Sequence, residues 1–138
     1  MAMPPDLSAA LAAVLQGWNS AARQWDARAL AALYTDDALF FGGRPSHAVG
    51  RPAIEQYFLS YAGEILSGRL ELADQHVLQL DAGNFLAQGY GDFSFVLRPD
   101  LRTASRLRTS WLLTRQGQDW KIRQHHFSPP PAVPPLGR

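Results

Sequence analysis

The second half of the chain constrains the fold most, because apolar and polar residues alternate through four long segments. These segments cover residues 69–80, 84–98, 101–115 and 119–128, and short turn-forming runs separate them. Alternation with a period of two is typical of strands that bury one face and expose the other. Strands that follow one another through short turns pair antiparallel, so the sequence predicts an antiparallel meander.

Three helices are predicted upstream of this meander. They cover about residues 6–23 and 27–34, and the third is opened by Gly50-Arg51-Pro52, with proline in its first turn. A short strand over residues 38–41 precedes the third helix. The predicted buried face of that helix comprises Ile54, Tyr57, Phe58, Tyr61 and Ile65. Helices followed by a meander indicate an α+β fold rather than a parallel α/β sheet.

Composition indicates one globular domain, which we predict over residues 1–131, followed by a proline-rich tail over 132–138. A net charge of +1 gives no sign of a nucleic-acid partner, and the lack of cysteine excludes disulfides and thiolate metal sites. The longest apolar run is too short to span a bilayer, and the first residues lack the positive start of a signal peptide. We therefore expect a cytoplasmic protein without a membrane partner.

The last predicted hairpin suggests a site. Centring its turn on Gly117 places Arg108 opposite His126 and Ser110 opposite Gln124 on one face. The other face then carries His125 near Thr109. On the first face, apolar residues gather near the turn and polar residues gather at the far end. This pattern predicts a sheet whose concave side is packed at one end and open as a pocket at the other.

The preceding strand extends this predicted pocket. Centring its turn on Asp100 places Asp92 opposite Arg108 and Tyr90 opposite Ser110. A slip of one residue at this turn would instead present the opposite face of the strand, with its two glycines and Phe93. With the first register, Tyr90, Asp92, Arg108 and His126 meet on three neighbouring strands.

The chemistry of this cluster suits an oxygen-rich ligand. Arg108 stays protonated under ordinary conditions, and burial beside a cation favours a neutral imidazole at His126. Such a pair can bind a carboxylate, an enolate or a carbonyl oxygen. An Asp92 paired with Arg108 would have a lowered pKa and would be a poor general base. Alternatively, the cluster is structural, with an Arg–Asp bridge closing the end of the sheet.

These considerations define the predicted site residues. The candidate catalytic residues are Asp92 and His126, and the candidate ligand-binding residues are Arg108, His126, Tyr90, Ser110, Ser128 and Tyr34. Motifs for serine nucleophiles, phosphate loops and dinucleotide binding are absent. His76 and His125 have no acidic partner at ligand spacing, so we predict neither a metal site nor a cofactor.

Several motifs together resemble one superfamily. The closing pattern is Trp120-x-Ile122-x-x-His125-His126-x-Ser128-x-x-Pro131, and Arg108-x-Ser110 lies on the preceding strand. Weaker matches cover residues 33–38, 50–54 and 89–93. This arrangement resembles the nuclear transport factor 2-like (cystatin-like α+β cone) superfamily. The resemblance extends over about residues 8–131, and is strongest to bacterial relatives of the calcium/calmodulin-dependent protein kinase II association domain and to SnoaL-like proteins.

The resemblance implies N-terminal helices packed in the concave face of a strongly bent antiparallel sheet, a pocket inside the cone, and a homodimer formed through the outer face of the sheet. It does not imply one reaction, because this fold hosts enzymes and non-catalytic domains. Kinase association domains carry arginine where this chain has Phe127, which makes an acidic-ligand pocket less cationic here. Ketosteroid isomerase relatives need a pocket carboxylate and an acidic donor, which only Asp92 and Tyr90 could supply.

Three functions remain open from the sequence. The first is a homodimeric protein that binds a small organic ligand, such as a carboxylate or a carbonyl compound, against Arg108, His126 and Tyr90. The second is an isomerase or cyclase without a cofactor, in which Asp92 or His126 transfers a proton. The third is a non-catalytic oligomerisation domain. The polar end of the sheet favours a pocket, but no pair of titratable groups favours catalysis.

Overall fold

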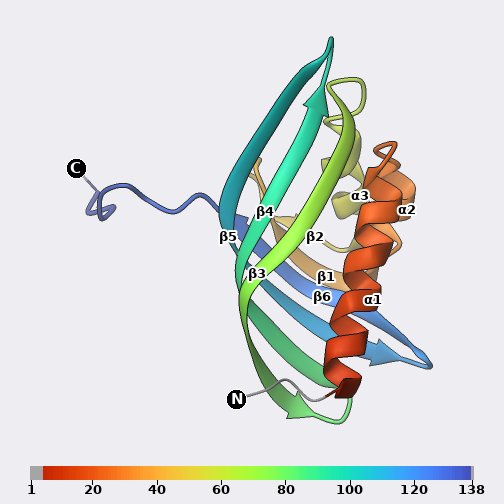
Figure 1. The fold of residues 1–138 in the computed structure, drawn as a ribbon. Helices are drawn as coiled ribbons and strands as arrows, with labels where there is room; N and C mark the ends of the chain where they lie inside the picture. Colours follow the sequence, from red (N-terminus) through yellow and green to blue (C-terminus); the bar gives the residue numbers. More distant parts are fainter. Residues whose placement is uncertain (1–4, 138) are drawn as a thin grey trace.

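A computed structural model describes residues 5–137 and shows one curved sheet wrapped around helices (Figure 1). The helices are α1 (Pro5–Ala22), α2 (Ala27–Ala31) and α3 (Arg51–Leu59). The strands are β1 (Tyr34–Phe41), β2 (Ala48–Val49), β3 (Ile65–Asp81), β4 (Asn84–Leu97), β5 (Leu101–Gln116) and β6 (Asp119–Ser128). They form one six-stranded sheet in the order β2-β1-β6-β5-β4-β3. The predicted α+β fold, with helices on the concave side, is confirmed.

The sheet is mixed rather than wholly antiparallel. Strand β1 runs parallel to β6, and the other neighbours pair antiparallel. The predicted second helix is also too long, because α2 ends at Ala31 and Tyr34 already begins β1. The Leu33 carbonyl accepts a hydrogen bond of 2.8 Å from the Ile122 N–H of β6. Pairing with β6 provides hydrogen-bond partners for the backbone groups at the end of the predicted helix in an extended conformation. This pairing outweighs the local helical propensity of these residues.

The third helix begins as predicted and ends earlier. Gly50 lies just before it with φ of 87°, a conformation that favours glycine, and Ile54 and Phe58 of α3 are buried. Helix α3 ends at Leu59, so Tyr61 follows the helix and Ile65 begins β3. Both were predicted on its buried face, and both still face the core or its edge.

The concave face of the sheet holds the hydrophobic core. The Asn19 side chain links α1 to β3 through two hydrogen bonds with the backbone of Leu70. It donates to the Leu70 carbonyl at 2.9 Å and accepts from the Leu70 N–H at 2.7 Å. The Trp18 ring meets Phe93 of β4 edge-on, with ring centres 6.0 Å apart. Trp18 and Trp25 also pack edge-on against each other, with ring centres 6.3 Å apart.

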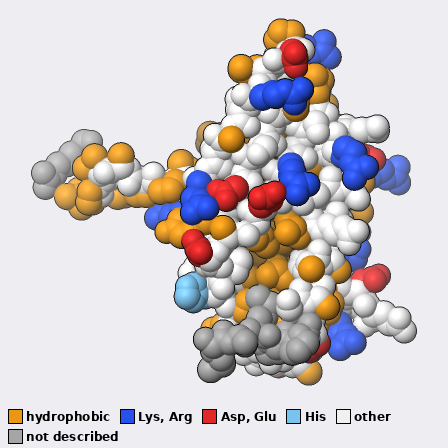
Figure 2. Space-filling view, in the orientation of Figure 1, with side chains coloured by type: hydrophobic (Ala, Val, Ile, Leu, Met, Phe, Trp, Pro, Cys, Tyr) orange, Lys and Arg blue, Asp and Glu red, His pale blue; other side chains and the backbone are white. Residues whose placement is uncertain are grey.

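The described residues that follow β6 lie outside this curved layer. Residues 129–137 follow β6 and extend away from the body (Figures 1 and 2). Residues 1–4 and 138, which belong to the predicted domain and tail, lie outside the described residues. Acidic and basic side chains are interspersed on the face that Figure 2 shows. None of the described helices is both long and apolar enough to cross a membrane.

Candidate functional site

The β5–β6 hairpin has a different register from the predicted one. Arg108 lies opposite Ser128, and Ser110 lies opposite His126. Near the turn Leu113 pairs with Ile122, but the next pair towards the open end is Leu112 with Gln124, so one residue of β6 is extra. That residue forms a β-bulge, which reverses the faces of β6 between the turn and the open end. The predicted pairing of Arg108 with His126 is therefore wrong by two residues.

The β4–β5 pairing is also shifted by two residues. Tyr90 lies opposite Arg108, and Asp92 lies opposite Arg106. The predicted pairing of Asp92 with Arg108 is therefore wrong. The turn is centred on Pro99, since the last strand pair is Leu97 with Leu101, whereas the prediction centred it on Asp100. A shift of two residues preserves the face, so Tyr90 and Arg108 still share one side of the sheet.

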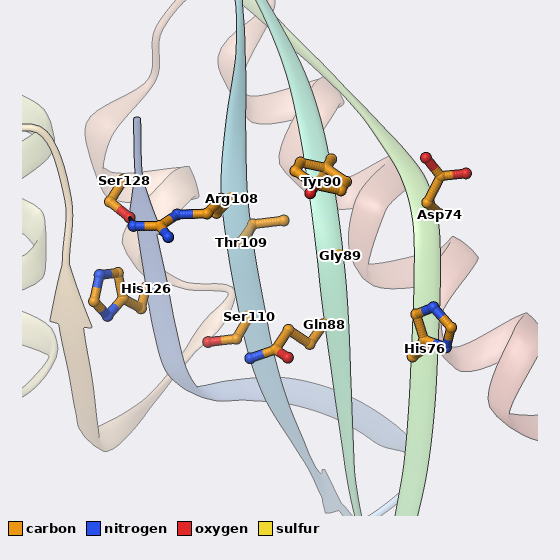
Figure 3. A pocket seen from close by; sticks show the side chains of 10 residues that line it. All are labelled: Asp74, His76, Gln88, Gly89, Tyr90, Arg108, Thr109, Ser110, His126 and Ser128. Atoms are coloured by element: carbon orange, nitrogen blue, oxygen red, sulfur yellow. Dashed lines mark hydrogen bonds between the residues drawn. The ribbon is translucent and has the colours of Figure 1, made fainter. Parts of the chain in front are cut away.

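That side is the outer face and not the inside of the cone. Arg108 and His126 are exposed on the surface that points away from the helices (Figure 3), whereas His125 is buried at 1% exposure among the core side chains. The prediction assigned His126 to the pocket of the cone and His125 to the opposite face, but His126 lies on the outer face and His125 on the inner face. The bulge in β6 explains the error, because it changes which residues of this strand point inwards.

The predicted ligand-binding residues nevertheless gather in one groove on the outer face. The groove has a volume of about 560 Å³ and crosses β3, β4, β5 and β6 (Figure 3). Its lining includes five of the predicted residues, namely Tyr90, Arg108, Ser110, His126 and Ser128. Asp74 and His76 of β3 form the opposite wall.

A bulge in β3 shapes that wall. The register shifts between Ala73 and His76, and Asp74 has φ of 53°. Gly89 of β4 makes this possible, because a Cβ atom there would lie 2.5 Å from the Asp74 carbonyl oxygen. Glycine therefore lets the two backbones approach at the groove.

Asp92 cannot serve as the predicted catalytic base. Its carboxylate receives hydrogen bonds of 2.8 and 3.0 Å from Arg106, which hold the pKa of Asp92 below its ordinary value. Asp92 lies on the outer face and does not line the groove or the interior of the cone. A carboxylate that is held ionised by an arginine has little tendency to take up a proton.

A second, smaller cavity lies inside the cone. It has a volume of about 280 Å³ and opens between α1, α3 and the inner faces of β3, β4 and β5. Its walls are almost entirely aromatic or aliphatic, with Glu64 as the single charged lining residue. The larger side chains around it are Trp18, Trp25, Tyr57, Phe58, Tyr61, Phe93, Phe95, Leu97, Leu107 and Phe127. The cavity is thus suited to an apolar ring and not to an anion.

A buried polar pair lies deeper in the cone. The Tyr34 hydroxyl and His125 Nδ1 are hydrogen-bonded at 2.8 Å. Burial lowers the pKa of His125 well below its ordinary value and raises the pKa of Tyr34, so both groups are neutral. Tyr34 was predicted among the ligand-binding residues, but it lies on the inner face, away from Arg108 and Ser110. The sequence reasoning missed this pair, although both residues lie in motifs that it singled out.

Four buried polar atoms near this pair have no hydrogen-bond partner among the described residues. They are the Nε1 atoms of Trp18 and Trp111, Thr109 Oγ1 and His125 Nε2. Unpaired buried polar atoms are uncommon and costly, which makes them candidates for contact with water or a ligand. Of the four residues that carry these atoms, only Trp18 lines the cavity. The His125 ring lies behind Phe127, which does line it, and the centres of these two rings are 5.1 Å apart.

The described residues contain no group of three or more histidine, aspartate or glutamate side chains that could hold a metal ion. His76, His126 and Asp74 line the same groove but do not form such a group.

Comparisons with known proteins agree with the fold. A family model described as the SnoaL-like domain matches residues 11–132. A solved structure of a protein assigned to the calcium/calmodulin-dependent protein kinase II association domains, from Xanthomonas campestris, is similar with a TM-score of 0.80 and 22% identity, over 89% of this chain and 87% of that one. No curated protein matches the chain.

Two further solved structures show the same fold. A ketosteroid isomerase-like protein from Erwinia carotovora atroseptica has a TM-score of 0.72 and 20% identity, over 91% of this chain and 97% of that one. A protein of unknown function with a cystatin-like fold from Nostoc punctiforme has a TM-score of 0.74 and 15% identity, over 97% and 98% of the two chains. At these identities the likeness extends to the fold and not to a reaction.

Proposed function

Because this chain belongs to the family of SnoaL-like domains, we propose that it binds a small apolar ring compound in the cavity inside its cone. The observation that carries this proposal is the lining of that cavity, which brings together side chains of α1, α3 and the inner sheet around about 280 Å³. Cavities with apolar walls and a few polar atoms are typical of sites for small organic ligands.

The lining of the cavity favours an uncharged ligand. Trp18 contributes the surface of its ring, because its Nε1 atom is fully buried and lies beside the Tyr34 hydroxyl. A carboxylate is disfavoured here, because Glu64 is the charged residue of the lining and no arginine or lysine joins it.

Binding is favoured over proton transfer. The one histidine inside the cone is His125, and its free Nε2 lies behind Phe127 rather than at the cavity wall. A catalytic base must come within hydrogen-bond reach of the proton it removes. Glu64 is the carboxylate of the lining, but it is exposed to solvent in the turn before β3, so we favour a ligand site over a proton-transfer site.

We also propose that the protein is a homodimer that packs through the outer face of its sheet. Large apolar side chains are exposed on both flanks of this face, with Leu39 and Phe41 on β1 and Leu78 and Leu80 on β3. Exposed apolar side chains that flank one broad face favour association. A second copy packed on these flanks would span the polar groove between them without filling it.

The cavity proposal is tested with 2-acetylnaphthalene, an apolar bicycle with one carbonyl group. Its binding is followed by quenching of tryptophan fluorescence, since Trp18 and Trp25 line the cavity. We expect saturable binding, and we expect Leu97→Phe to weaken it at least about tenfold by filling the cavity. Leu59→Phe is the matched control, because Leu59 is exposed on α3 and does not line the cavity.

A second comparison tests the role of Trp18. Trp18→Phe should weaken the binding of 2-acetylnaphthalene and of 2-ethylnaphthalene by similar factors, because it reduces the ring surface that contacts both ligands. Trp25 then serves as the fluorescent reporter. Absence of saturable binding, or equal affinities in Leu97→Phe and Leu59→Phe, would refute the cavity proposal.

A further inference from the structure

We propose that the outer groove is a separate ligand site, which binds the carboxylate of a small organic acid through Arg108. The groove lies on the face of the sheet opposite to the cone cavity, and the two share no lining residue (Figure 3). The proposal therefore does not depend on what the cone binds.

Arg108 is a cation whose charge is not neutralised within the groove. Its described contact is a long hydrogen bond of 3.4 Å from Nη2 to Ser128 Oγ, and none of the described carboxylates lies within ion-pair distance. Arg106, two residues earlier on the same face, is instead engaged by Asp92 at 2.8 Å and approached by Asp74 at 3.9 Å. The planar guanidinium of Arg108 thus retains donors for a two-point contact with a carboxylate.

Further hydrogen-bonding side chains surround this guanidinium. Ser128 faces Arg108 across the β5–β6 ladder, and Ser110 and His126 form the next pair on the same face of the sheet. Figure 3 shows Arg108 and Ser128 close together, with His126 and Ser110 beside them on the same side of the sheet. Hydroxyl and imidazole groups can donate hydrogen bonds to the remaining lone pairs of the carboxylate.

The opposite wall limits the class of anion. Asp74 brings a negative charge to the β3 side of the groove, about two strand spacings, or roughly 10 Å, from Arg108. A single carboxylate near Arg108 is compatible with this charge, whereas a multiply charged phosphate is repelled. Tyr90 lies between the two walls in Figure 3, so its ring can carry the apolar part of the ligand.

The test uses benzoate with benzyl alcohol as its uncharged analogue, and it follows the backbone amide signals of the ¹⁵N-labelled protein by NMR. We expect benzoate to shift signals of β4, β5 and β6 around the groove in a saturable way, and benzyl alcohol to have no saturable effect. Arg108→Gln should weaken benzoate binding at least about tenfold. Arg102→Gln is the matched control, because Arg102 lies on the same strand, is exposed and does not line the groove.

Two measurements separate this proposal from those above. Leu97→Phe, which fills the cone cavity, should leave benzoate binding unchanged, and Arg108→Gln should leave the sedimentation behaviour unchanged. Loss of benzoate binding in Leu97→Phe would place the ligand in the cone and overturn the groove proposal. Dissociation of a dimer by Arg108→Gln would show that Arg108 contacts a second copy, and would overturn it as well. Equal benzoate affinities in Arg108→Gln and the unchanged protein would also overturn the groove proposal.

Discussion

Two adjacent histidines illustrate how surroundings decide the chemistry of a residue. His125 is buried against aromatic rings and bonded to Tyr34, whereas His126 is exposed and lines the outer groove. Burial is the main cause of the lowered pKa of His125, and the charge of His126 is a smaller one. The inner histidine is therefore a neutral part of the core.

The buried histidine predicts a pH dependence of stability. Below its ordinary pKa of about 6.5, the unfolded chain binds a proton at His125 that the folded protein does not bind, so the free energy of unfolding falls as the pH decreases. The slope from one such group is at most about 1.4 kcal/mol per pH unit. Urea unfolding between about pH 5 and pH 7 measures this slope, and His125→Gln should flatten it.

His76→Gln is the control for this measurement, because His76 is exposed on β3. It should retain the slope of the unchanged protein. Equal slopes in the His125→Gln variant and the unchanged protein would contradict a neutral His125 in the folded state.

At the scale of the element, one residue of β6 decides which side chains point into the cone. Ile122 and His125 both face inwards although two residues lie between them, which in a regular strand would place them on opposite faces. They share a face because Arg123 is the extra residue of the bulge. Arg123 itself is exposed and forms an ion pair of 3.1 Å with Asp37 of β1. The bulge is thus accommodated at the side of the sheet that faces away from the core.

Deletion variants test this role of the bulge. Deleting Arg123 removes the extra residue and keeps every other β6 side chain on its own face. The loss of stability should therefore be small, because an exposed ion pair contributes little. Deleting Lys121 forces Trp120 and Ile122 onto opposite faces and should cost at least about 2 kcal/mol more. Urea unfolding with circular dichroism compares the two, and equal losses would contradict the role of the bulge.

The elements also show how far the sequence was informative. Alternation predicted the four long strands, and the grouping of Tyr90, Arg108, Ser110 and His126 survived register errors of two residues because such errors preserve the face of a strand. Neither the bulge at Arg123 nor the pairing of β1 with β6 has a local signal, since both arise from contacts between distant segments. For this reason the face on which the cluster lies was not predicted correctly, and the Tyr34–His125 pair was missed.

At the scale of the whole molecule, the outer face of the sheet is the surface most suited to self-association. Its apolar side chains lie on both flanks, on β1 and on β3, while the groove between them is polar. A partner that contacts both flanks would bury apolar area without having to fill the groove. The helices cover the other face of the sheet, which is therefore not available for this purpose (Figure 1).

The dimer is tested by analytical ultracentrifugation at micromolar concentration. We expect the unchanged protein to sediment as a dimer and the double variant Leu39→Glu/Leu78→Glu to dissociate, with association weakened at least about tenfold, because a carboxylate on each flank is costly to bury. Leu59→Glu on α3 serves as a matched control, since Leu59 is similarly exposed but lies on the helical side. A monomeric unchanged protein would refute the dimer.

Because the sheet is a single layer, its two surfaces can change separately by substitution. Along β5 and the C-terminal part of β6, neighbouring residues line opposite surfaces of the sheet. Leu107 and Phe127 line the cavity of the cone, whereas the residues that follow them, Arg108 and Ser128, line the outer groove. One stretch of sequence therefore encodes two surfaces in interleaved positions. Substitutions at every second residue can alter the specificity of one surface while the other keeps its side chains, so the two sites are free to diverge independently within the same strands.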